Sequence, residues 1–165
     1  MTGSMEPAAG AVAAWSRHAS SDVDPTRLRA QLTEGTLPQA FHDVAREAGH
    51  KRAVSVEGEA ASYAELEDTA GRIAAWLRER GLGREDRVVL CGRNSLGFVL
   101  AYLGIVRAGA VVVLAGPDLT ERELRHIVVH SGARAAFASA DAYGRLASIG
   151  VDGRLDPVVA LDGQS

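Results

Sequence analysis

The chain is poor in the residues that mark nucleic-acid-binding and disulfide-stabilised proteins. Only 5% of its 165 residues are aromatic, and its formal net charge is −3 at pH 7. Binding to nucleic acid generally needs a cationic surface that releases counterions, together with aromatic rings that stack on bases. A single cysteine, Cys91, excludes a disulfide within the chain. We therefore predict no nucleic-acid partner and a reducing compartment, the cytoplasm.

The sequence also has little that would enter a membrane. Residues 1–20 lack the basic segment and apolar core of a secretory signal. Residues 96–115 carry one charge, Arg107, and are long enough to span a bilayer. The other interpretation, a buried helix followed by a buried strand, is favoured because a charge near the middle of a span would cost roughly 2.5–3.5 kcal/mol. We predict no membrane span.

Recognisable catalytic motifs are lacking as well. No phosphate-binding G-x-x-x-x-G-K-[ST] loop is present, and no G-x-S-x-G elbow positions a serine nucleophile. His126 and His130 lie four residues apart, a spacing that can place two imidazoles on one metal ion. No third ligand accompanies them, so we interpret both as residues of a polar helix face. The sequence predicts no metal site and no catalytic residue.

What the sequence does contain is an alternation of helix and strand patterns. Three helix starts show a capping pattern, in which Ser or Thr is followed three residues later by Glu or Gln: Thr36, Ser62 and Thr120. Together with apolar residues at helical spacing, these starts predict helices over residues 36–48, 62–80 and 120–131, the last of which Gly132 ends. A further helix, capped by Asn94 or Ser95, is predicted to run to about residue 108 and to stop at Gly109, and a weaker one is predicted over 141–149. Short apolar runs predict strands over residues 52–57, 87–91, 110–115, 133–138 and 156–161.

This alternation predicts an α/β fold with a mostly parallel, doubly wound sheet and flanking helices. The 110–115 run has no polar alternation, which is typical of a strand buried on both faces of such a sheet. The helix before it is apolar on every side, so we expect protein around it. Residues 1–35 lack sustained periodicity and are predicted to be a mobile tail. Residues 36–165 form the predicted domain.

Two segments carry a family resemblance. Residues 61–66 (ASYAEL) resemble the first core motif of the AMP-forming, adenylate-forming enzymes, which include acyl-CoA synthetases, luciferases and peptide-synthetase adenylation domains. Residues 102–113 (YLGIVRAGAVVV) resemble the second core motif. The similarity extends in order and spacing over about residues 36–140. It implies the first part of the large N-terminal domain of an acyl-CoA synthetase-like ligase.

The resemblance implies an incomplete active site. Complete relatives use ATP and Mg²⁺ to activate a carboxylate as an acyl-adenylate, and then pass the acyl group to CoA or a carrier thiol. Their phosphate-binding loop and later ATP-binding segments have no counterpart here, and Lys51 does not match their catalytic lysine. Because the reaction needs donors and a metal ion around the phosphoryl group, we expect the chain alone to bind none of these cofactors and to be inactive.

Two roles remain open for such a segment. One is the N-terminal part of a ligase, and the alternative is a non-catalytic docking or regulatory protein built on the same half-domain. Either role predicts a partner for its apolar surface, which is a complementary ligase segment or a second copy of the chain.

Three residues form the candidate binding site: Gly116, Pro117 and Asp118, which follow the predicted 110–115 strand. In complete relatives the loop after this strand lies near the channel for the thiol acceptor, so the resemblance implies substrate binding here. The proline is displaced from its usual family position. The other interpretation is an ordinary turn from a strand into a helix.

Overall fold

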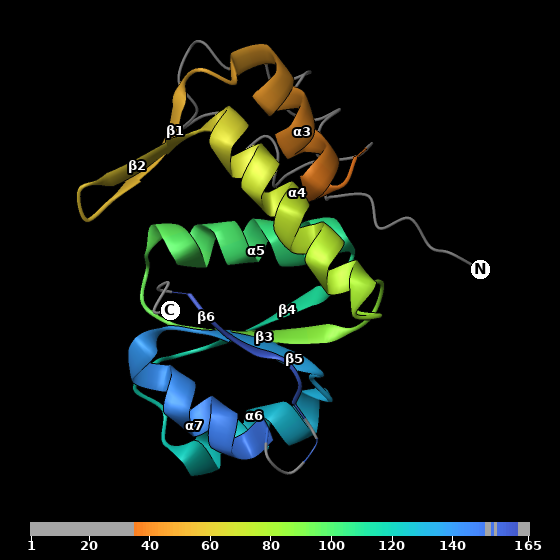
Figure 1. Cartoon of the computed structure of the whole chain (residues 1–165), viewed down its shortest axis with the longest axis vertical. Coiled ribbons are helices and arrows are strands. Elements are labelled where there is room, and N and C mark those ends of the chain that lie inside the picture. Colours follow the sequence, from red (N-terminus) through yellow and green to blue (C-terminus); the bar gives the residue numbers. More distant parts are fainter. Residues whose placement is uncertain (1–34, 151–152, 154, 162–165) are drawn as a thin grey trace, which may run out of the picture. The chain divides into compact units, whose positions relative to one another are not determined.

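A computed structural model describes residues 35–150, 153 and 155–161 (Figure 1). The predicted mobile tail lies almost entirely outside the described residues. The chain divides into two compact units, Met1–Phe41 and His42–Ser165, with the boundary inside helix α3, Leu37–Ala48. At the start of this helix the hydroxyl of Thr36 accepts a hydrogen bond from the Gln39 amide at 3.4 Å. The capping pattern therefore located the helix start correctly.

A parallel sheet forms the centre of the second unit. Its strands, in spatial order, are β4 (Val111–Ala115), β3 (Arg87–Cys91), β5 (Ala135–Ala138) and β6 (Val158–Ala160). Every neighbouring pair is parallel. Within this sheet the chain forms β3 first and then β4 on one side of it. It then crosses to the other side of β3, where it forms β5 and β6. This arrangement confirms the predicted α/β class and the doubly wound parallel sheet.

Helices cover both faces of this sheet (Figure 1). One face carries α4 (Tyr63–Glu79) and α5 (Leu96–Ala108), and the other carries α6 (Glu121–Ser131) and α7 (Ala140–Gly150). Side chains of β3 alternate between the two faces, as the period of a strand requires. Leu90 packs with the α4 and α5 side, whereas Val89 packs with α6 and α7, and both are completely buried.

The helix ends follow the sequence signals. Ser62 and Thr120 each form a reciprocal capping box with the glutamate three residues on, and Ser95 caps α5. Gly109 and Gly132 end α5 and α6 in the left-handed conformation, with φ of 90° and 67°. A residue without Cβ adopts this conformation without strain, which explains why each helix stops where it does.

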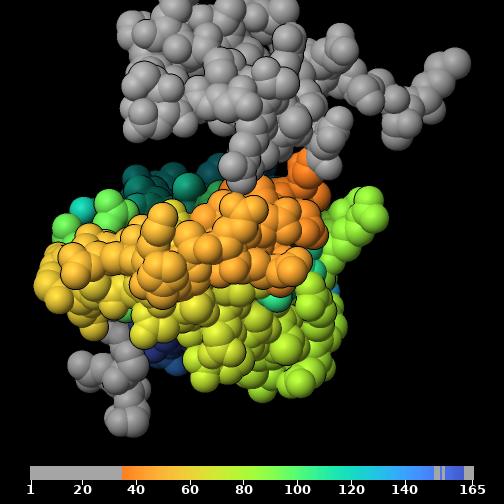
Figure 2. All heavy atoms as spheres, turned by 90° about the horizontal axis from the view of Figure 1, so that it is seen from above, coloured from red at the N-terminus to blue at the C-terminus, as the bar shows by residue number. Residues whose placement is uncertain are grey.

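A small antiparallel sheet precedes α4. Strands β1 (Arg52–Val56) and β2 (Glu59–Ser62) form a hairpin whose two turn residues, Glu57 and Gly58, have φ of 51° and 88°. This turn matches the right-handed twist of the strands. Figure 2 shows the hairpin in gold beside α4 in yellow, and it contacts both α4 and α5. Strand β2 was not predicted, because its alanines and glutamate have low strand propensity.

One burial prediction is wrong. The 110–115 strand is not buried on both faces, because β4 lies at the edge of the sheet. Val111 and Leu114 are 49% and 61% exposed. Val112 still packs towards α5 and Val113 towards α6. An uninterrupted β-branched run indicates a strand in a covered sheet, but it does not distinguish a central strand from an edge strand.

The prediction for the preceding helix holds only in part. Ala101, Gly104, Ile105 and Ala108 of α5 are buried, while its remaining residues are partly exposed. Residues 96–115 therefore divide into a helix and a strand that reverse at Gly109, which rules out a continuous span. Within the described part of the chain, no helix has the length and apolarity that crossing a bilayer requires.

Candidate functional site at the carboxyl edge of the sheet

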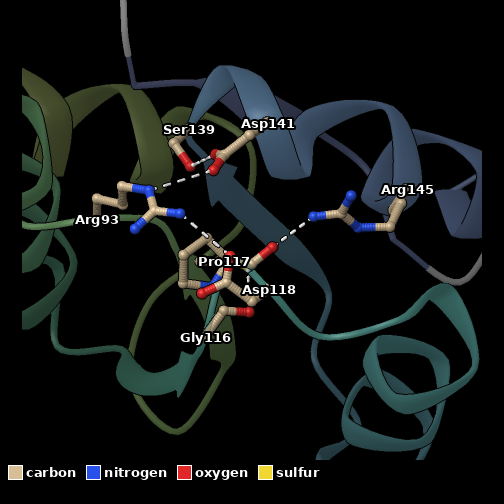
Figure 3. Close-up of polar contacts among 8 residues, drawn as sticks. Arg93, Gly116, Pro117, Asp118, Ser139, Asp141 and Arg145 are labelled. Atoms are coloured by element: carbon tan, nitrogen blue, oxygen red, sulfur yellow. Dashed lines mark hydrogen bonds and ion pairs between the residues drawn. The ribbon is translucent and has the colours of Figure 1, made fainter.

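Parallel strands bring their carboxyl ends to one edge of the sheet, and three loops meet there. Cys91 ends β3, Ala115 ends β4 and Ala138 ends β5. The winding direction reverses between β3 and β5, and open α/β sheets bind ligands in the crevice outside such a reversal. The residues that follow these three strands are therefore the candidate site (Figure 3).

The predicted loop, residues 116–118, is held to its neighbours by its backbone. The Gly116 carbonyl accepts hydrogen bonds from the Cys91 thiol and the Leu119 amide, both at 3.4 Å. The Pro117 carbonyl accepts one from the guanidinium of Arg145 on α7. The Asp118 carboxylate remains accessible, with its side chain 82% exposed. Of the three predicted binding residues, Asp118 is the one that offers a side-chain group to a ligand.

Arg93 connects the loops that follow β3, β4 and β5. Its Nη2 lies 3.1 Å from Asp118 Oδ1, and its Nε lies 3.6 Å from Asp141 Oδ2. The Ser139 hydroxyl donates a hydrogen bond to Asp141, and this bond, with the charge of Arg93, holds the pKa of Asp141 below its usual value. Figure 3 shows the Arg93 guanidinium reaching towards both carboxylates. All three charged side chains are substantially exposed, so each pair contributes at most about 1 kcal/mol.

The thiol beneath the loop is not a nucleophile. Cys91 is completely buried. Burial raises the pKa of its thiol, and the opposing effect of Arg145 is smaller. Because the thiolate is the reactive form, this cysteine is inert at neutral pH. The prediction that Cys91 is a core residue is confirmed.

The crevice itself is filled by the chain. The Leu161 amide donates to the Ala138 carbonyl at 2.8 Å, which places Leu161 across the ends of β3 and β5. A Cβ on Gly92 would lie 3.0 Å from Leu161 Cδ1, and one on Gly97 would lie 2.6 Å from the Leu161 carbonyl oxygen. At Gly97 a side chain would force backbone to move, and at Gly92 it would push on the end of the Leu161 side chain. A ligand at this edge can therefore contact the outer rim, formed by Arg93, Asp118 and Asp141, and not the crevice.

The comparisons with known proteins decide the family. Residues 41–164 match the family model described as AMP-binding enzyme. The chain belongs to this AMP-binding enzyme family. It is 36% identical over 122 residues to triostin synthetase I from Streptomyces triostinicus and 35% identical over 122 residues to a long-chain-fatty-acid–CoA ligase from Escherichia coli O157:H7.

Solved structures of AMP-binding relatives have the same fold. The benzoate CoA ligase from Burkholderia xenovorans superposes with a TM-score of 0.70 over 77% of this chain, at 26% identity. The fatty acyl CoA synthetase from Mycobacterium tuberculosis gives a TM-score of 0.65 over 74% of this chain, at 23% identity.

This chain spans only part of its AMP-binding relatives. The alignments cover 74% and 73% of it, but 23% of triostin synthetase I and 21% of the E. coli ligase. The solved benzoate CoA ligase and fatty acyl CoA synthetase are covered to 25% and 26%. The shared part is an N-terminal portion of the family, as the resemblance implied.

Sequence reasoning found Asp118 of the rim and missed Arg93, Asp141 and the Ser139 hydroxyl that bonds to Asp141. Arg93 follows β3 by two residues, and Ser139 and Asp141 follow β5 within three. Their shared position just after buried strands was the available signal, because such ends converge at one edge. The predicted 116–118 loop is one of the three loops that meet at this edge.

Two further clusters lie away from the edge. His126 and His130 are exposed on α6 with ring centroids 5.6 Å apart. No group of three or more metal-ligating side chains occurs among the described residues. A cavity of about 520 Å³ lies between α3, α4 and α5, and Glu67 and Arg107 form an ion pair in its lining.

Proposed function

We propose that this chain is the N-terminal segment of an AMP-forming acyl-CoA synthetase-like ligase, and that it contributes structure to that enzyme without supplying its catalytic groups. The family match over residues 41–164 carries the proposal. In the complete reaction, a carboxylate attacks the α-phosphorus of ATP to give acyl-AMP and pyrophosphate. A thiol then attacks the acyl carbon to give a thioester and release AMP.

The chain lacks the groups that this chemistry requires. Charge that develops on the transferring phosphoryl group must be stabilised by donors and a metal ion. The sequence contains no phosphate-binding loop of the family pattern. At the carboxyl edge, the two aspartates beside Arg93 give the exposed rim a negative formal charge, which disfavours an anionic nucleotide. ATP, Mg²⁺ and CoA or a carrier thiol therefore belong to the complete enzyme, in the cytoplasm.

Within this proposal, the 116–118 loop borders the path of the thiol acceptor. Asp118 is the exposed acceptor on that loop, and Arg93 is the nearest exposed donor. Together they present a small polar surface at the rim of a sheet edge whose crevice is closed by Leu161. Such a rim suits hydrogen bonding to a flexible polar chain better than binding of a triphosphate.

A complementary ligase segment is the proposed partner of this chain. The outer side of α5 is apolar and partly exposed, and the hairpin beside it forms a two-stranded sheet among the residues that the structure describes. Two strands are marginally stable alone, so the hairpin gains from further strands. A docking or regulatory protein is the second candidate. The exposed Val111 and Leu114 on β4 favour it, because they offer a contact surface independent of any catalytic group.

Two assays test the proposal. The isolated chain should give no ATP–pyrophosphate exchange with a panel of fatty, aromatic and amino acids, and exchange above background would contradict it. In the second assay, residues 41–161 replace the aligned segment of the E. coli long-chain-fatty-acid–CoA ligase. A folded, active chimera supports a structural contribution to a ligase. A folded but inactive chimera, with the parent enzyme active in parallel, favours the docking role.

A further inference from the structure

Helix α6 presents a pair of histidines on its exposed side. His126 and His130 are both exposed, and their rings lie nearly parallel, with centroids 5.6 Å apart and an interplanar angle of 15°. Residues four apart in a helix lie on one face, about 6 Å apart along the axis. The capping box at Thr120 and the left-handed Gly132 fix the two ends of α6. The helix backbone therefore holds the two imidazoles side by side.

The ring nitrogens of this pair are not engaged by other groups of the chain. Neither His126 nor His130 forms a hydrogen bond or an ion pair with another described residue. His42 is different, because its Nδ1 lies 2.7 Å from Glu67 Oε1. A neutral imidazole has one nitrogen with a free lone pair, which can bind a metal ion. The pair thus offers two such nitrogens to one ligand.

The separation of the rings fits two bonds to one metal ion. Imidazole nitrogens bind Zn²⁺ at about 2.0–2.1 Å. Two imidazoles on one ion at a tetrahedral angle then have centroids roughly 5 Å apart, which is close to the observed 5.6 Å. The rings must turn about χ2 so that both nitrogens face the ion. This terminal torsion is broad, and exposed side chains rotate within nanoseconds.

The surroundings accommodate a cation and its remaining ligands. A surface cavity of about 470 Å³ lies at the start of α6, and His126, Arg122 and Glu123 are among the residues that line it. The hydrogen bonds of Thr120 and, more weakly, the charge of Arg122 hold the pKa of Glu123 below its usual value. This carboxylate is therefore ionised and balances Arg122. His130 lies in the last turn of α6, where the helix dipole favours a positive charge.

We infer that His126 and His130 chelate one divalent transition-metal ion, with Cu²⁺ bound more tightly than Ni²⁺ or Zn²⁺. Imidazole suits these three metals, and their affinity for a given set of ligands is highest for Cu²⁺. Water completes the coordination, because no group of three or more metal-ligating side chains occurs in the described part of the chain. The sequence alone favoured a polar helix face, since spacing does not show whether two rings are close together and unengaged.

Titration of the full chain with CuCl₂ tests this site. The protein is purified without a histidine tag and freed of metal with a chelator, and calorimetry at neutral pH measures the affinity. We expect one tightly bound Cu²⁺ per chain, whose electron paramagnetic resonance spectrum shows coupling to two nitrogen nuclei. His126→Gln and His130→Gln should each weaken binding about tenfold or more, because the second imidazole binds at high effective concentration. His50→Gln removes another exposed histidine and is the matched control, which should leave the affinity unchanged.

Moving one histidine by a helical turn tests the spacing. Combining Arg122→His with His130→Gln removes one imidazole and places a new one four residues before His126, at an exposed position. This variant should recover most of the Cu²⁺ affinity that His130→Gln loses, and circular dichroism establishes that every variant is folded. A tight site that survives both single His→Gln variants, or no recovery in the combined variant, overturns the inference. Metal binding is measured without ATP or acid, so its failure leaves the ligase proposal untouched.

Discussion

Arg107 of α5 donates a hydrogen bond to Glu67 of α4 and forms an ion pair with it, across the contact between these two helices. Glu67 Oε1 also lies 2.7 Å from the His42 ring nitrogen Nδ1 on α3. Arg107 is the one charge in residues 96–115, and the structure shows why that charge is tolerated. Its partner lies on the neighbouring helix, so neither group is buried alone.

Removing Arg107 should destabilise the fold. In Arg107→Met, the Glu67 side chain, which is 17% exposed, loses its charged donor, so we expect the free energy of unfolding to fall by about 1–3 kcal/mol. Urea denaturation followed by circular dichroism measures it. Arg72→Met is the control, because Arg72 pairs with Asp68 on the surface and both side chains are about 70% exposed. That change should stay within about 0.5 kcal/mol. Equal losses of unfolding free energy in the two variants would contradict a stabilising role for the Arg107–Glu67 pair.

The same carboxylate should make stability depend on acid pH. Burial alone would raise the pKa of Glu67, but the bonds and charges of Arg107 and His42 outweigh it, so the pKa lies below 4.5. A carboxylate whose pKa is lower in the folded state than in the unfolded state stabilises the fold. This contribution is complete above the unfolded-state pKa and is lost as the pH falls through the folded-state pKa. The stability advantage of the native chain over Glu67→Gln should therefore shrink below pH 4.5.

Urea titrations of the two proteins from neutral to acid pH make this measurement. Asp86 and Asp141 also have lowered pKa values, and they contribute the same acid dependence to both proteins. Only the difference between the proteins reports Glu67. A difference that stays constant across the acid range would show that Glu67 keeps its ordinary pKa in the folded state.

Local signals in the sequence located most elements, because each depends on a few neighbouring residues. The capping residues Ser62, Ser95 and Thr120 and the left-handed Gly109 and Gly132 fix helix ends through backbone hydrogen bonds and φ alone. Strand β3 and helix α5 begin and end as predicted. These features need no knowledge of tertiary contacts.

Strand order and the rim residues depend on contacts far apart in the sequence, and there the prediction fell short. Nothing within residues 110–115 shows that β3, rather than β4, occupies the centre of the sheet. Arg93 and Asp118 are 25 residues apart and meet only because their strands are parallel neighbours. The 116–118 loop was predicted from a family resemblance, and its role in binding stays a prediction.

Cys91 should resist alkylation in the folded protein. It is completely buried and burial raises the pKa of its thiol, so the reactive thiolate is scarce and inaccessible. Treatment with iodoacetamide at neutral pH, followed by mass spectrometry, should show almost no modification without denaturant and complete modification in concentrated urea. Because the chain has one cysteine, the mass shift has one source. Rapid labelling of the folded chain would show that the core between the sheet and helices α6 and α7, where Cys91 lies, opens readily.

Leu161 should hold the carboxyl edge together, and a single methyl group tests this. In Gly97→Ala the new Cβ would lie 2.6 Å from the Leu161 carbonyl oxygen, so backbone on one side must shift. We expect a loss of about 1–3 kcal/mol, the usual cost of overpacking a closed contact. Gly144→Ala places the same methyl in α7, where nothing lies within 4 Å, and helix propensity should make it neutral or stabilising by up to about 1 kcal/mol. If both alanines raise stability in urea denaturation, Leu161 does not close the crevice, and the ends of β3 and β5 are open to a ligand after all.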